Sequence, residues 1–153
     1  MWRVITFIVW VSPGLAFGQD ALFDLAGVWG GAGTYLDRNI SEEIRCRMNI
    51  SSDLEMTEIE GVCASARRKE NLNLRISRGV NNELSIEDLT SNTRNQGQMH
   101  GVLYDDGVRF SLNSNNQVTS LTILLTSHES MEWKIVISTQ SRTQSTAVEF
   151  VRQ

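Results

Sequence analysis

Short runs of alternating apolar and polar residues fill most of the chain, and this pattern restricts the fold. Gly, Asn, Asp and Ser separate the runs, no long stripe of helical period occurs, and the only proline is Pro13. Alternation with a period of two places every second side chain on one face of a strand, which is typical of antiparallel sheets. Ten strands are predicted, near residues 25–36, 43–50, 57–64, 71–78, 83–90, 98–104, 108–113, 118–126, 132–139 and 145–152.

Successive strands with no helices between them favour a meander, in which each strand pairs with the next one along the chain. Such a meander closes into a barrel or forms a sandwich. We expect an all-β, antiparallel up-and-down meander that closes into a lipocalin-like barrel of 8–10 strands with one disulfide.

Three hairpin registers follow from the requirement that apolar residues face apolar residues. The first folds at Asp106-Gly107, which favours a type I′ turn and brings Tyr104 to Arg109 on the other face. The second folds within residues 128–132, and the third folds near Thr143. The predicted pairs are Leu103 with Phe110 and Gly101 with Leu112; Leu125 with Trp133, Ile123 with Ile135 and Leu121 with Ile137; and Ile137 with Val148 and Ile135 with Phe150.

Residues 1–18 are predicted to be a signal peptide. Arg3 supplies the positive charge, residues 4–11 are apolar, and residues 12–18 end in small residues, so cleavage is expected before Gln19. The apolar segment is far shorter than the ~20 residues needed to span a bilayer. We therefore expect residues 19–153 to form a single domain of a periplasmic or secreted protein, a monomer with no stable membrane span after cleavage.

The two cysteines, Cys46 and Cys63, are the number that one disulfide needs in an exported chain. A wide loop centred on residues 54–55 places them opposite each other on neighbouring strands, and it also aligns Met48 with Gly61. Two buried free thiols are the alternative. A zinc site would need additional ligands, and no His lies near either cysteine in the sequence.

The charge balance disfavours nucleic acid as a partner, because the chain carries 14 basic and 18 acidic residues. The only basic run, at residues 67–69, is expected to be a solvated loop. The glycine-rich segment at residues 27–33 precedes no predicted helix, so it is no dinucleotide-binding motif.

The segment "LAGVWGG", at residues 25–31, resembles the start of lipocalin-like barrels of the calycin superfamily. In those proteins a Gly-x-Trp opens the first strand, and an Arg of the last strand stacks across the Trp. The matching residues here are Gly27, Trp29 and Arg152. The resemblance implies that Trp29 plugs one end of a barrel, and a large ring can fill such an end.

Two further resemblances concern function. "WGGAGTY", at residues 29–35, resembles the first strand of nitrobindin-type haem barrels, which bind haem through a late His; no His follows His128 here, so no haem is expected. "LAGVWGGAGTY", "IRCRM" and "GVCASARR" resemble small exported proteins of alphaproteobacteria. That resemblance implies an exported location and a Cys46–Cys63 pair, and it implies no activity.

The residues that commonly carry catalysis are scattered. His100 and His128 are predicted to lie on the surface, and the Ser, His and Glu within residues 127–130 are too close in sequence to suggest a triad. The paired carboxylates fall in a turn at residues 105–106 and on a solvated strand face at residues 58–60. We therefore expect no enzyme, no metal and no cofactor.

A binding protein remains as the main hypothesis, with a small apolar ligand or lipid inside the barrel. The alternative is a periplasmic protein-binding domain of the protease-inhibitor type, which would use the loop at residues 51–58 to hold a protein partner. The residues predicted to line a cavity are Met48, Gly61, Gly101, Leu103, Phe110, Ile123, Ile135 and Phe150.

Overall fold

The computed structural model describes residues 20–90, 98–114 and 116–153, so the predicted signal peptide lies outside the described residues. All ten predicted strands are confirmed, with ends that differ by a few residues. The elements are α1 (Ala21–Asp24), β1 (Gly27–Asp37), β2 (Ile40–Ser52), β3 (Met56–Ala64), β4 (Lys69–Arg78), β5 (Glu83–Asp88), β6 (Met99–Tyr104), β7 (Gly107–Ser114), β8 (Gln117–Ser127), β9 (Ser130–Thr139) and β10 (Thr143–Arg152).

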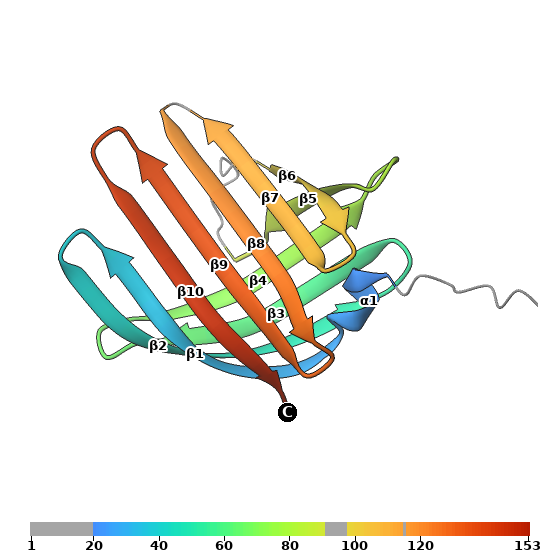
Figure 1. The fold of residues 1–153 in the computed structure, drawn as a ribbon, viewed down its shortest axis with the longest axis horizontal. Coiled ribbons are helices and arrows are strands. Elements are labelled where there is room, and N and C mark those ends of the chain that lie inside the picture. The colour runs from blue at the N-terminus through green and yellow to red at the C-terminus, as the bar shows by residue number, and fades with distance from the viewer. Residues whose placement is uncertain (1–19, 91–97, 115) are drawn as a thin grey trace, which may run out of the picture.

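The strands form a closed antiparallel barrel. Each strand pairs with its neighbour in the sequence, and β1 pairs with β10 to close the ring. Figure 1 shows β7 to β10 crossing in front of β2 to β4. The all-β meander expected from the alternation is thus confirmed, with ten strands.

The turn between β6 and β7 differs from the prediction. Tyr104 pairs with Gly107, so the turn consists of residues 105–106, and the predicted Asp106-Gly107 turn is wrong. Gly107 is buried with a φ of 149°, and a Cβ at this position would lie 2.0 Å from the carbonyl oxygen of Ile123. The glycine therefore permits the close approach of β7 to β8, and its positive φ comes directly after the two turn residues.

All three predicted hairpin registers are displaced by an even number of residues. The displacement is two residues for β6–β7 and for β8–β9, and four residues for β9–β10. An even displacement keeps each side chain on its predicted face, because the side-chain period of a strand is two. The observed pairs are Gly101 with Phe110 and Leu103 with Val108; Leu121 with Ile135, Ile123 with Trp133 and Leu125 with Met131; and Ile135 with Thr146 and Trp133 with Val148.

The register of β2 and β3 agrees with the prediction. Cys46 pairs with Cys63 across the two strands, and the two residues form a disulfide with a Cα–Cα distance of 4.1 Å. Met48 pairs with Gly61 in the same ladder. The predicted disulfide between neighbouring strands is thus confirmed.

One end of the barrel carries α1, which the sequence analysis did not predict. The side chain of Asp20 caps this single helical turn by accepting a hydrogen bond from the amide of Leu22, at 3.0 Å. Figure 1 places α1 beside the turns that join β2 to β3 and β6 to β7, and we call this the closed end. Within the residues that the structure describes, no helix is long and apolar enough to cross a membrane.

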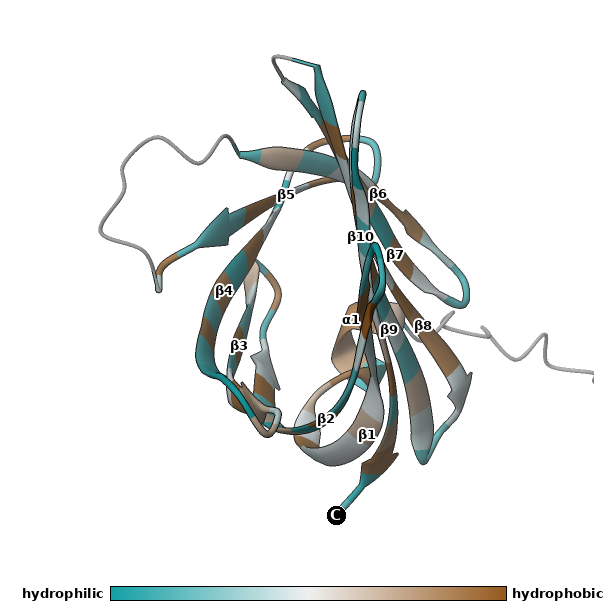
Figure 2. Ribbon diagram, turned by 90° about the vertical axis from the view of Figure 1, so that its left-hand side faces the viewer, coloured by the Kyte–Doolittle hydropathy of each residue, from teal (hydrophilic) through white to brown (hydrophobic). Residues whose placement is uncertain are grey.

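The opposite end of the barrel, which we call the open end, carries the turns at residues 38–39, 65–68 and 140–142. Between the two ends, the inward positions of the strands form one apolar core, and polar residues alternate with them (Figure 2). The buried core includes Leu22, Leu25, Trp29, Met48, Ile59, Ile76, Val108, Phe110, Leu121, Ile123, Met131, Trp133, Val148 and Phe150.

Candidate functional site

Two neighbouring cavities occupy the half of the barrel near the open end. The first has a volume of about 300 Å³ and the second about 520 Å³, and we call them the first and second lobes. They share the wall residues Leu72, Trp133, Ile135 and Ile137. Ligand pockets span roughly 300–1,000 Å³, so each lobe is large enough for a small molecule.

The first lobe is aromatic and sulfur-rich at its sides. Phe150 of β10 and Trp133 of β9 line one side, and the Cys46–Cys63 disulfide joins the two strands on another. Met48, one pleat deeper on β2, adds a thioether. These side chains are apolar and polarizable, so the depth of the first lobe favours apolar or aromatic groups.

The second lobe is bounded mainly by aliphatic side chains. Strands β5 and β6 have six residues each and are the shortest of the ten, and the lobe lies beside them. The polar side chains that border the lobe are Asp88 of β5, Ser114 of β7, and Gln117 and Thr119 of β8. Its aliphatic walls are Leu72, Leu74, Ile86, Met99, Leu112, Leu121, Ile135 and Ile137.

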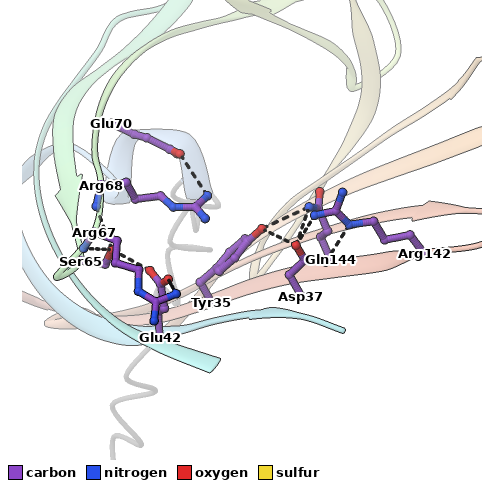
Figure 3. Close-up of polar contacts among 9 residues, drawn as sticks. All are labelled: Tyr35, Asp37, Glu42, Ser65, Arg67, Arg68, Glu70, Arg142 and Gln144. Atoms are coloured by element: carbon purple, nitrogen blue, oxygen red, sulfur yellow. Dashed lines mark hydrogen bonds and ion pairs between the residues drawn. The ribbon is translucent and has the colours of Figure 1, made fainter. Parts of the chain in front are cut away.

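A buried carboxylate organises one side of the open end. Asp37, at the end of β1, accepts hydrogen bonds on both oxygens from the guanidinium of Arg142, and Gln144 and Tyr35 also donate to it (Figure 3). The hydrogen bonds from Arg142, supported by those from Gln144 and Tyr35, lower the pKa of this carboxyl to about 2. Asp37 also raises the pKa of Arg142. The group therefore stays a charged, internally neutralised pair that fixes the β9–β10 turn to β1.

A second polar group faces it across Tyr35 (Figure 3). Glu42 of β2 accepts a hydrogen bond from Ser65 at 2.8 Å, and Arg67 lies 3.6 Å from its other oxygen. The guanidinium carbon of Arg68 lies 4.6 Å from the centroid of the Tyr35 ring. The first lobe is thus bordered at the open end by polar residues, which we call the mouth: Tyr35, Glu42, Ser65, Arg68, Glu70 and Gln144.

The closed end holds the residues that the sequence resemblance assigned to a plug. Trp29 is fully buried and donates a hydrogen bond from its ring nitrogen to the carbonyl of Leu25, at 2.8 Å. Arg152 lies over the ring, at 4.4 Å from its centroid, and donates to the carbonyls of Asp24 and Ala26. Trp29 and Arg152 therefore lie together at the end away from the mouth.

The structure distributes the eight predicted lining residues over three places. Met48, Ile135 and Phe150 line the first lobe, and Ile135 lines the second lobe as well. Gly101 and Phe110 border a separate groove of about 470 Å³ at β5, β6 and β7. The other three, Gly61, Leu103 and Ile123, line neither lobe, and Ile123 is fully buried in the core.

The two histidines lie apart on the surface. His100 lies on β6 and His128 in the β8–β9 turn, and both are exposed. In the part of the chain that the structure describes, no group of three or more His, Cys, Asp or Glu is placed to hold a metal ion. The carboxylates of Glu58 and Asp106 each lie within 3.5 Å of an arginine, Arg75 and Arg109 respectively.

The loop considered as a protein-binding surface is short and internally hydrogen-bonded. Asp53 accepts hydrogen bonds from the amides of Glu55 and Met56, both at 2.8 Å, and these bonds lower the pKa of its carboxyl. Leu54, at the tip, is 81% exposed. The loop therefore presents one apolar side chain on a well-defined turn.

Sequence reasoning missed the mouth and the Asp37–Arg142 pair beside it. These residues are polar and lie near strand ends, where polarity is also expected of any solvated turn. One signal was available, because Tyr35 continues the inward alternation of Trp29 and so points into the barrel near its open end. Nothing in the local sequence pairs it with Arg68 of the β3–β4 turn or with Gln144 of β10, which are distant in the sequence.

No protein-family model and no curated protein matches the sequence. The S-type phycobiliprotein lyase CPES from Guillardia theta is similar in structure, with a TM-score of 0.66 and 9% identity over 86% of this chain and 90% of that one.

A protein of unknown function from the DUF3598 family of Nostoc punctiforme is also similar in structure. Its TM-score is 0.58 at 13% identity, and the match covers 86% of this chain and 49% of that one, so this chain spans about half of its length. At such identities the likeness bears on the fold alone. The closed ten-stranded meander and these neighbours together show that the chain folds as an all-β, antiparallel up-and-down barrel.

Proposed function

We propose that the protein binds a small, mainly apolar molecule inside the barrel and performs no catalysis itself. The observation that carries this proposal is the pair of neighbouring lobes, which are lined mainly by apolar side chains, with the first lobe bordered by the polar mouth. Burying apolar surface of a ligand there is worth roughly 25 cal/mol per Å² removed from water. Pockets of this kind, with apolar walls and a few placed polar groups, are typical of small-molecule sites.

The two ends of the barrel take different roles in this proposal. Trp29 and α1 fill the closed end, so a ligand approaches from the open end. Its apolar part enters the first lobe beside Trp133 and Ile135, which also line the second lobe.

The proposed place of action is the periplasm or the extracellular space. The predicted signal peptide favours this location, and the Cys46–Cys63 disulfide is compatible with it because disulfides persist in oxidising compartments. The resemblance to small exported proteins of alphaproteobacteria points the same way. The likeness to a phycobiliprotein lyase supports the barrel as a scaffold and brings no substrate to this chain.

A neutral dye tests the proposal. N-phenyl-1-naphthylamine emits strongly in apolar surroundings, and we expect saturable binding with direct excitation of the dye. Ile135→Trp should abolish most of this binding, because Ile135 lies on the wall shared by both lobes. Lys134→Trp is the matched control, since the neighbouring side chain is exposed and alternation turns it away from the lobes.

Extraction of the exported protein with organic solvent, followed by mass spectrometry, supplies a second readout. A co-purified small molecule in stoichiometric amount supports the proposal. The proposal is wrong if the extract is empty and the dye shows no saturable binding to the folded protein. It is also wrong if Ile135→Trp and Lys134→Trp bind the dye as tightly as the unchanged protein does.

A further inference from the structure

The β3–β4 turn places the only basic run of the chain at the mouth. Residues 67–69 are Arg67, Arg68 and Lys69, and all three are exposed. Arg68 lines the first lobe, whereas Arg67 and Lys69 do not. A sequence run that is typical of a solvated loop therefore delivers one guanidinium to the border of an apolar cavity.

The position of Arg68 is defined by the aromatic ring beneath it. Its guanidinium carbon lies 4.6 Å from the centroid of Tyr35, a distance typical of cation–π contacts. Tyr35 is itself fixed, because Gln144 donates to its hydroxyl at 3.1 Å and the hydroxyl donates to Asp37 at 3.4 Å. The ring thus acts as a platform that holds a planar cation beside the lobe.

The two most buried carboxylates near the mouth already have partners. Asp37 is neutralised by Arg142, and both of its oxygens accept hydrogen bonds. Glu42 has a side chain that is only 10% exposed, and it accepts from Ser65 and lies near Arg67. These two negative charges are therefore offset inside the protein and offer little attraction to a cationic ligand.

Arg68 has a weaker partner. Its terminal nitrogen lies 3.8 Å from Glu70, and the two side chains are 45% and 65% exposed, respectively. A pair at that distance and exposure contributes little, because water screens it. Glu70 is largely exposed, whereas Arg68 is also held by its contact with Tyr35.

We propose that Arg68, held on the Tyr35 ring, recognises the carboxylate of an anionic amphiphile whose apolar chain lies in the lobes. This inference rests on the proposed function, and it names the class of ligand. The guanidinium can donate two parallel hydrogen bonds to a carboxylate, which an ammonium cannot do. Lys69 adds positive potential near the same position, whereas the charge of Arg67 is offset by Glu42.

Decanoate and 1-decanol test the head group while the chain stays the same. Each is titrated against protein loaded with N-phenyl-1-naphthylamine, and displacement gives the two affinities. We expect decanoate to bind about tenfold more tightly than 1-decanol, with a preference that shrinks as salt is added. Arg68→Gln should remove this preference by weakening decanoate about tenfold and changing 1-decanol less than twofold.

Glu70→Gln is the matched control, because it removes the neighbouring opposite charge and leaves the cation in place. It should keep or increase the preference for decanoate. The fold of the Arg68→Gln variant is protected, because the turn is closed by the amide of Ser65 on the carbonyl of Arg68 and by Ser65 Oγ, not by the Arg68 side chain. Arg68→Lys should retain part of the preference.

The outcomes separate this inference from the proposed function. Equal affinity of the unchanged protein for decanoate and 1-decanol overturns the role of Arg68 and leaves an apolar ligand site in place. An unchanged preference in Arg68→Gln has the same meaning. Failure of both compounds and of the dye to bind overturns the inference and the proposed function together.

Discussion

The guanidinium carbon of Arg152 lies 4.4 Å from the centroid of the Trp29 ring, so the last strand covers the residue that fills the closed end. The same guanidinium donates to the carbonyls of Asp24, at 2.7 Å, and of Ala26. Its Nε donates at 3.0 Å to the carbonyl of His128 in the β8–β9 turn. One side chain thus joins α1, the first strand, the last strand and a turn.

Arg152→Ala should lower the free energy of unfolding by about 2–4 kcal/mol. The substitution removes a cation–π contact of about 0.5–2 kcal/mol and leaves carbonyls of the α1 segment without their donor. Urea unfolding followed by far-ultraviolet circular dichroism measures the change without relying on Trp29 emission. Gln153→Ala is the control, because that side chain is exposed and makes only a 3.4 Å hydrogen bond to Val151. A decrease in the free energy of unfolding no larger than that of the control would contradict this stabilising role of Arg152.

The Asp37–Arg142 pair predicts a loss of stability in acid. The pKa of Asp37 in the folded protein is about 2, below the ordinary value of an unfolded aspartate near 4. A depressed folded-state pKa stabilises the fold above the unfolded-state pKa, and that contribution is lost as the pH falls from about 4 through about 2. Asp37→Asn removes the charge at every pH.

Urea unfolding of the two proteins between pH 7 and pH 2 checks this sign. The unchanged protein should be the more stable one at pH 7, and the difference should shrink progressively below pH 4. Glu60→Gln serves as the control, because Glu60 is an exposed carboxylate on β3. A difference between the unchanged protein and Asp37→Asn that stays constant down to pH 2 would mean that the pair does not titrate in this range.

The order of strands could be predicted from the sequence, whereas most registers could not. Period-two alternation identifies the faces of each strand, but a displacement by two or four residues leaves those faces unchanged. Three hairpins were displaced in this way, including the one at Gly107. The β2–β3 register was correct because Cys46 and Cys63 had to meet, and a covalent bond tolerates no such displacement.

The candidate site, too, could be predicted from the sequence only in part. Its apolar depth follows from alternation, which placed Met48, Ile135 and Phe150 inside the barrel. Its mouth depends on tertiary contacts between strand ends, such as Arg68 over Tyr35 and Gln144 beside Asp37. The one-turn helix α1 was missed because four residues are too few to show a helical period.

The glycines of β1 should be sensitive to added methyl groups. A Cβ on Gly33 would lie 1.9 Å from the carbonyl oxygen of Ala147 and 2.6 Å from the Cα of Val148. Backbone atoms cannot give way as a flexible side chain can, so Gly33→Ala should cost about 2–4 kcal/mol or prevent folding. Gly79→Ala is the control, since its nearest neighbour would be 3.3 Å away. Comparable stability of the two variants would show that β1 and β10 separate easily.

The Cys46–Cys63 disulfide should contribute to stability through the unfolded chain. It closes a loop with a sequence separation of 17, for which the loss of chain entropy predicts about 3 kcal/mol. Replacing both cysteines by serine should therefore lower the free energy of unfolding by about this amount, measured by urea denaturation of the oxidised protein. A reducing agent should destabilise the unchanged protein and leave the double variant unaffected. Labelling of both cysteines by iodoacetamide in the unreduced exported protein would instead show that the bond does not form.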